Sequence, residues 1–170
     1  MLSVSLSSAL SQPRCGAGYI AGVFNLDLSN WNTSNVTSMS SMFTNAGSNA
    51  TTWDIGNLSN WNTSNVTNMY SMFYQAGQNA PTFNLNLSNW NASNVTAMSG
   101  MFYYAGSGFT GNSAATFSLD LSNWNASNVT NMHEMFKQAG YYFKNFSLNL
   151  NNWNIKNVTD MSNMFYESEH

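Results

Sequence analysis

The chain of 170 residues is long enough for one domain with a sizeable core, and its 43% hydrophobic and 15% aromatic content argues against disorder. Only 6% of the residues are charged and the formal net charge is −3, so no basic face exists for phosphates and nucleic-acid binding is not expected. The single cysteine, Cys15, cannot form an internal disulfide, and no apolar run reaches the roughly 20 residues of a membrane span.

Residues 1–23 are predicted to form a degenerate amino-terminal cap. Ala17 and Gly18 match the Ala-Gly pair that closes later repeat units, but Pro13 and Arg14 stand where those units have Met and Phe. A terminal repeat without a neighbour needs such an atypical unit. The first ten residues lack a cationic flank and a strongly apolar centre, so they do not make a convincing signal peptide.

A sixteen-residue phrase, LSNWNTSNVTSMSSMF, begins at Leu28 and returns four times with few changes. Its tryptophan recurs in steps of 30, 29, 34 and 29 residues, at Trp31, Trp61, Trp90, Trp124 and Trp153. A period of this length is typical of solenoids, in which each unit buries its apolar face against its neighbours. Residues 24–170 are therefore predicted to form a repeat solenoid of about five coils.

Each repeat opens with a predicted strand. Phe24, Leu26 and Leu28 alternate with polar residues, as one buried face of a strand requires, and the pattern returns in later units. The second unit departs from it, because Trp53 and Ile55 stand one residue out of register. A bulge or an irregular strand is expected there.

After each tryptophan the apolar spacing changes from two residues to three or four. In the first unit the spacing predicts a short helix over residues 36–47, with Gly47 as its left-handed stop. The same frame recurs over residues 66–77, 95–106 and 129–140. The predicted fold class is therefore α/β, a right-handed solenoid of strand–turn–short-helix coils with one parallel sheet, and a β-solenoid with short helical turns is the alternative.

The repeated phrase, with its NVTxMxxMF core in five copies, resembles the repeat of BspA-like leucine-rich repeat surface proteins, in the DUF285 branch of mycoplasma and protist type. The resemblance runs from Phe24 to Phe165. It implies a leucine-rich-repeat-like fold and an extracellular or cell-surface location with a role in adhesion. It implies little about the chemistry.

Asparagine columns run through all five units. One of them is predicted to be a buried structural ladder at the corner after the strand, because stacked amides can bond to each other and to the neighbouring backbone. An unpaired amide there would cost about 1–3 kcal/mol. The ladder consists of Asn35, Asn65, Asn94, Asn128 and Asn157.

No catalytic, cofactor-binding or metal-binding constellation is found in the sequence. It has no glycine-rich phosphate loop or nucleophile elbow, and neither His133 nor His170 has metal-ligand spacing. Asp27 and Asp120 share a column, but units without a charge separate them. The protein is therefore predicted not to be an enzyme and to use no cofactor.

Two functions remain open. The first is a scaffold that recognises a protein or glycan partner through the polar face of its strands, because this face is rigid and nearly uncharged. The second is a structural subunit within a larger assembly, in which another chain covers the open carboxy-terminal coil. The candidate partner-binding residues are Asn25, Asp27, Asn84, Asn86, Asp120 and Asn149.

Overall fold

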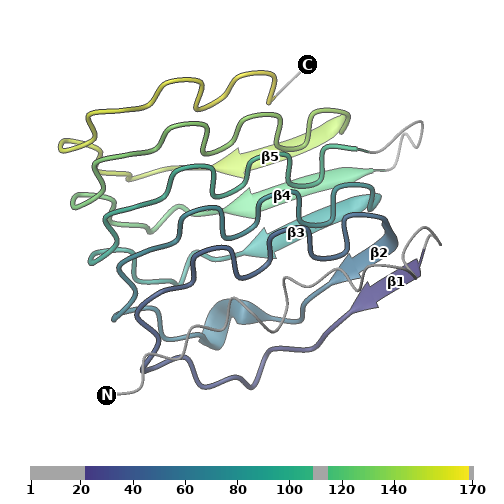
Figure 1. Ribbon diagram of the computed structural model, residues 1–170, viewed down its shortest axis with the longest axis horizontal. Helices are drawn as coiled ribbons and strands as arrows, with labels where there is room; N and C mark the ends of the chain where they lie inside the picture. The colour runs from purple at the N-terminus through teal and green to yellow at the C-terminus, as the bar shows by residue number, and fades with distance from the viewer. Residues whose placement is uncertain (1–21, 109–114, 169–170) are drawn as a thin grey trace.

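The computed structural model describes residues 22–108 and 115–168, which form five stacked repeat units (Figure 1). Each unit begins with one strand, and we number the units one to five in chain order. The strands are β1 (Gly22–Asn25), β2 (Ala50–Asp54), β3 (Thr82–Asn86), β4 (Thr116–Asp120) and β5 (Asn145–Asn149), and a 3-10 helix, η1 (Leu58–Asn60), follows β2. All strand pairs are parallel, so the structure is a parallel-strand repeat architecture.

The strands form because apolar and polar residues alternate in them. In β3, Phe83 and Leu85 are buried whereas Asn84 and Asn86 are exposed, and β4 and β5 continue the same register. The prediction of one sheet is wrong, because the described strands pair as β1-β2 and as β3-β4-β5. The break follows the second unit, where the sequence pattern slips by one residue.

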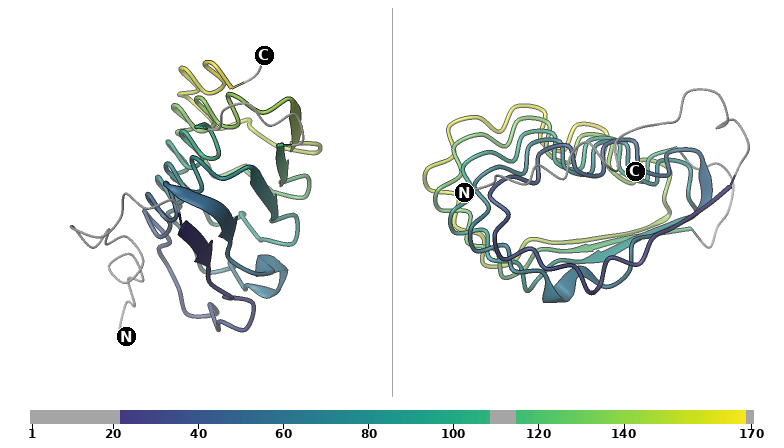
Figure 2. Two further views of the ribbon diagram at one scale, coloured as in Figure 1. Left: turned by 90° about the vertical axis from the view of Figure 1, so that its right-hand side faces the viewer. Right: turned by 60° about the horizontal axis from the view of Figure 1, so that its bottom comes forward.

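The predicted helices at residues 36–47, 66–77, 95–106 and 129–140 are absent, and within the described ranges the only helix is η1. A run of tight turns occupies each place, and we call it the turn segment: residues 39–47, 69–77, 98–106, 132–140 and 161–168. Figure 2 shows the turn segments as one wall of the stack and the strands as the other.

Left-handed residues explain why no helix forms. Ser41 and Asn45 have φ angles of 56° and 60°, and the matching residues of the other units are also positive. A helix cannot pass through such residues. The backbone bonds instead to the next unit: the amides of Met39, Ser41 and Phe43 donate to the carbonyls of Asn68, Tyr70 and Met72 at 2.8–2.9 Å.

Three ladders of stacked rings fill the core between the two walls. Neighbouring rings in the ladder Phe43–Phe73–Phe102–Phe136–Phe165 lie 5.0–5.5 Å apart. A second ladder runs Trp53–Phe83–Phe117–Phe146. The third joins the five repeat tryptophans, Trp31, Trp61, Trp90, Trp124 and Trp153.

The third ladder also joins neighbouring units by hydrogen bonds. Trp90 donates its indole N–H to the Leu58 carbonyl at 2.9 Å, and Trp124 donates to Leu87 at 2.7 Å. Because the indoles of units two to five each bond to the preceding unit, these tryptophans both fill the core and satisfy a backbone carbonyl. No described helix is long and apolar enough to cross a membrane.

The cap predicted for residues 1–23 lies outside the described residues except for Gly22 and Val23, which belong to β1.

Candidate functional site

The outward side chains of the strands form a polar surface, which we call the strand face. It consists of Asn25, Asp27, Asp54, Asn84, Asn86, Ser118, Asp120, Ser147 and Asn149. The parallel register aligns these side chains in rows across β3, β4 and β5. The upper row is Asn84, Ser118 and Ser147, and the lower row is Asn86, Asp120 and Asn149.

Four of the six sequence-predicted partner-binding residues share this three-stranded sheet. They are Asn84, Asn86, Asp120 and Asn149. Asn25 lies in β1, in the other sheet, opposite Asp54. Asp27 follows β1 and is exposed.

The lower row also holds the turns that follow the strands. Asn86 accepts from the Ser88 amide at 3.1 Å and from its hydroxyl at 2.7 Å, and Asp120 accepts from the Ser122 amide. Asn149 does the same for the Asn151 amide. These side chains are therefore partly committed to the fold.

Asp27 has the same role in unit one. Its carboxylate accepts from the hydroxyl and the amide of Ser29, at 2.5 and 2.9 Å. These two bonds, the hydroxyl first, hold the pKa of the Asp27 carboxyl below its usual range despite a small opposing effect of desolvation. Asp27 is therefore an anion that is held in place by its own turn.

The side chains of the upper row cap no turns, in contrast to those of the lower row. Asn84 contacts the Thr116 hydroxyl at 3.3 Å, and Ser118 and Ser147 cap no turn among the described residues. Their amide and hydroxyl groups are exposed donors and acceptors. The sequence already places Ser118 and Ser147 on the polar face of the strands, because they alternate with Phe117, Leu119, Phe146 and Leu148.

The strand face presents amide, hydroxyl and carboxylate groups that can form hydrogen bonds. Its charges are the carboxylates of Asp27, Asp54 and Asp120, which belong to different units. Over residues 22–108 and 115–168, no group of three or more His, Cys, Asp or Glu side chains could hold a metal ion.

The asparagine ladder lies at the corner that follows each tryptophan. Asn65 and Asn94 donate their side-chain amides to the carbonyls of Ser34 and Ser64 in the preceding unit, both at 2.7 Å. Asn128 and Asn157 make the same bond. The prediction that the ladder is buried is wrong, because all five asparagines are exposed. Its bonds join the backbones of neighbouring units at the surface and do not fill the core.

We expect Asn94→Ala to lower the free energy of unfolding by about 1 kcal/mol, the net value of one hydrogen bond. Asn94→Asp should cost more, because it points an acceptor at the Ser64 carbonyl. The matched control is Asn89→Ala, since the Asn89 side chain is exposed and makes no hydrogen bond within the described residues. Urea denaturation measures the free energy of unfolding of all three variants. Equal stability of Asn94→Ala and Asn89→Ala would mean that the hydrogen bonds of the ladder do not stabilise the fold.

A family model described as "Mycoplasma protein of unknown function, DUF285" matches residues 20–113 and 107–170 of the chain. The two matched segments together span all five tryptophan units. No curated protein and no solved structure matches the chain.

Proposed function

Because this chain belongs to the DUF285 family, we propose that it is a non-catalytic repeat scaffold, a right-handed solenoid whose strand face recognises a protein or glycan partner. The observation that carries the proposal is the upper row on β3, β4 and β5, where the Asn84 amide and the Ser118 and Ser147 hydroxyls are exposed in register. An extended partner that offers hydrogen-bonding groups at regular intervals suits such a surface.

Two physical properties favour recognition by this face. Neutral amides and hydroxyls lose less on desolvation than charged groups do, so hydrogen bonds to a partner retain more of their value. The strands are also held from beneath, because Phe83, Phe117 and Phe146 stack under them with ring centroids 4.8–5.2 Å apart. A preorganised surface avoids the entropic cost of ordering side chains and backbone on binding.

The test is binding of the purified chain to a panel of immobilised neutral and acidic glycans. We expect neutral glycans to bind and the double variant Asn84→Lys with Ser147→Lys to lose at least about tenfold in affinity, because two long cations replace upper-row groups. The upper row is chosen because the lower row caps turns, so that changes there would also alter stability.

The matched control is Tyr70→Lys with Tyr142→Lys, which adds the same charge at two exposed positions away from the strands. It should bind as the unchanged protein does. Loss of binding in the control alone would contradict partner recognition by the strand face. The same conclusion would follow if the chain bound neither a glycan nor a surface protein of the same source.

We extend the proposal to location: the chain acts outside the cell or at its surface, as the family resemblance implies. Labelling of intact and of permeabilised cells of the source organism with an antibody against the chain tests this. Labelling that requires permeabilisation would contradict it.

A structural subunit is the second proposed function, and one observation favours it. The last described unit exposes apolar side chains that are buried in every other unit, among them Met161 and Phe165. Monomeric proteins rarely leave such side chains together in solvent, so another chain is proposed to cover them.

A further inference from the structure

The tight turn that leads from each strand to the repeat tryptophan carries an asparagine that the fold does not use. In every unit the tryptophan amide donates to the carbonyl of the leucine three residues earlier, at 3.0–3.4 Å, and the asparagine stands just before the tryptophan. Its side chain is exposed in all five units and makes no hydrogen bond to another described residue. We call this column the asparagine row: Asn30, Asn60, Asn89, Asn123 and Asn152.

The turns that carry the row are fixed from beneath. In units one to four the leucine that begins the turn is at most 2% exposed, and the indole of the following unit donates to its carbonyl. These bonds continue across the break between β2 and β3, where Trp90 reaches Leu58. The rings of the phenylalanine ladder repeat every 5.0–5.5 Å, so the row offers one amide per repeat on a backbone that needs no ordering to bind.

Turn chemistry does not explain why every unit has asparagine at this place. Only Asn152 has a positive φ, 67°, a conformation that favours asparagine over most residues. The other four have negative φ angles, which most residue types accept in a tight turn. Duplication of the repeat does not explain it either, because a partly exposed column in the turn segments has diverged, to Thr44, Tyr74, Tyr103, Lys137 and Tyr166.

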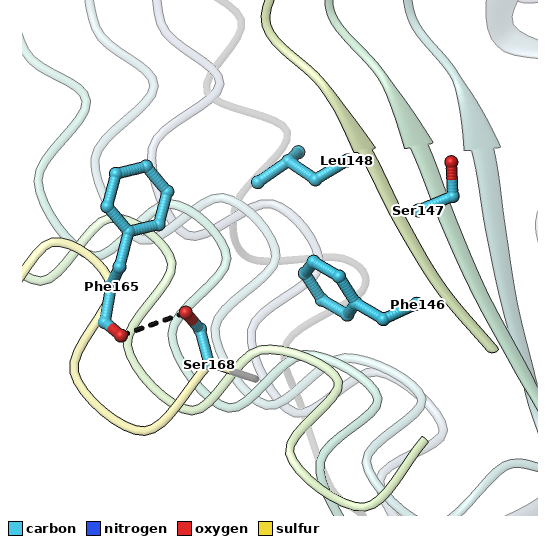
Figure 3. Close-up of a pocket in the computed structure, with 5 residues that line it drawn as sticks. All are labelled: Phe146, Ser147, Leu148, Phe165 and Ser168. Carbon is cyan, nitrogen blue, oxygen red and sulfur yellow. Dashed lines mark hydrogen bonds between the residues drawn. The ribbon is translucent and has the colours of Figure 1, made fainter. Parts of the chain in front are cut away.

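The strand face has diverged as well. Figure 3 shows Phe146 and Leu148 on one side of β5 and Ser147 on the other. The register partners of Ser147 in the upper row are Ser118 and Asn84, so the residue type changes along the stack. The asparagine row does not change, and a surface that repeats without variation suits a ligand that repeats in the same way.

A second column of asparagines flanks the row. These side chains accept the backbone amide two residues later at 3.0–3.3 Å, so their oxygens are engaged and their NH₂ groups are exposed donors. In unit three this residue is Asn91, which the buried Trp90 separates from Asn89. The flanking column is Asn32, Asn62, Asn91, Asn125 and Asn154.

The complement of the row is linear, uncharged and rich in hydroxyl groups, because each amide both donates and accepts and none carries a charge. We propose that the asparagine row binds a straight neutral polysaccharide of β-1,4-linked hexopyranoses, which runs along the stack. In such a chain both edges carry hydroxyl groups at every sugar, and each sugar advances by nearly the repeat of the stack. The inference goes beyond the proposed function, because the row lies outside the strand face.

The experiment titrates the full chain with β-1,4-linked glucose oligomers of two to six sugars and follows the side-chain NH₂ signals of asparagine by NMR. We expect the signals of the row to shift. The affinity should rise by about threefold with each added sugar up to the fifth, because each sugar gains a hydrogen bond to a further unit. Oligomers with α-1,4 linkages coil away from a straight row and should gain no affinity beyond two sugars.

Two double variants give the matched comparison. Asn89→Ala with Asn123→Ala should weaken binding of the five-sugar oligomer by about tenfold and leave thermal stability unchanged, since neither side chain bonds to the described fold. Asn49→Ala with Asn79→Ala removes two exposed asparagines near the start of the strands, which bond to each other, and should bind as the unchanged protein does. Near-ultraviolet circular dichroism verifies that both variants fold.

The inference would be overturned if no oligomer bound, or if two sugars bound as tightly as five. Equal binding of the α-linked oligomers, or unchanged affinity of Asn89→Ala with Asn123→Ala, would also overturn it. Loss of binding in Asn84→Lys with Ser147→Lys, while the signals of the row do not move, would place the ligand on the strand face instead. The two proposals can therefore fail separately.

Discussion

Phe102→Ala is expected to lower the free energy of unfolding by about 3–5 kcal/mol, measured by urea denaturation. Phe102 is 0% exposed and lies between Phe73 and Phe136, at centroid distances of 5.2 and 5.5 Å. Truncation removes its burial, leaves a cavity and separates two rings that no other side chain can join. The cost is high because units in a repeat stack are stabilised chiefly by their neighbours.

Phe165→Ala is the matched control for this prediction. Phe165 occupies the same column, but it stacks on one ring only and is 43% exposed. Its loss should cost at most about 1 kcal/mol, because little buried area disappears. Similar losses from the two variants would mean that the ladder does not concentrate stability in the middle of the stack.

Gly106→Ala is expected to cost about 2–4 kcal/mol, from a left-handed backbone and a steric clash together. Gly106 has a φ of +58°, and a Cβ there would lie 2.9 Å from the Cβ of Phe83 and 3.3 Å from the Phe117 ring. Neither ring can move far, since both belong to a stacked ladder.

Gly100→Ala separates the two causes. Gly100 has nearly the same φ, +60°, but the nearest atom to its Cβ would be the Ser71 hydroxyl at 3.3 Å. Serine and glutamate occupy the matching positions, at Ser41, Ser71 and Glu134, with positive φ angles. The backbone alone should therefore cost about 1 kcal/mol. Equal thermal shifts for Gly100→Ala and Gly106→Ala would contradict the clash.

The strand half of each unit was predictable, and the turn half was not. Phe83 and Leu85 alternate with asparagines, and only a strand places that pattern on one face. Met69, Met72, Phe73 and Ala76 instead fit helical spacing, but repeated tight turns bring the same residues inward. Ser71 and Gln75 adopt left-handed conformations that cannot be predicted from their residue types, so the apolar spacing alone wrongly predicted a helix.

The position of the candidate site could be predicted from the sequence, but which of its side chains are free to bind a partner could not. Alternation places Asn84 and Asn86 on the outer face, and the structure has both exposed there. Whether such a side chain is free depends on the backbone that follows it: Asn86 caps its turn through Ser88, whereas Asn84 does not. The asparagine ladder was misplaced for a related reason, since a repeated polar column can bond between units without leaving the surface.

The one-way hydrogen bonds of the turn segments have an electrostatic consequence. Peptide groups that all donate in one direction add their dipoles, each about 3.5 D, as they do in an α-helix. Here the summed dipole points along the stack of units, perpendicular to the local direction of the chain. The amides of Thr67 and Gly77 donate in the opposite direction, toward the preceding unit, so the summed dipole is confined to residues 39–45 and their counterparts. The positive pole lies at unit five, so the wall of turns attracts anions at its carboxy-terminal end, where an α-helix would repel them.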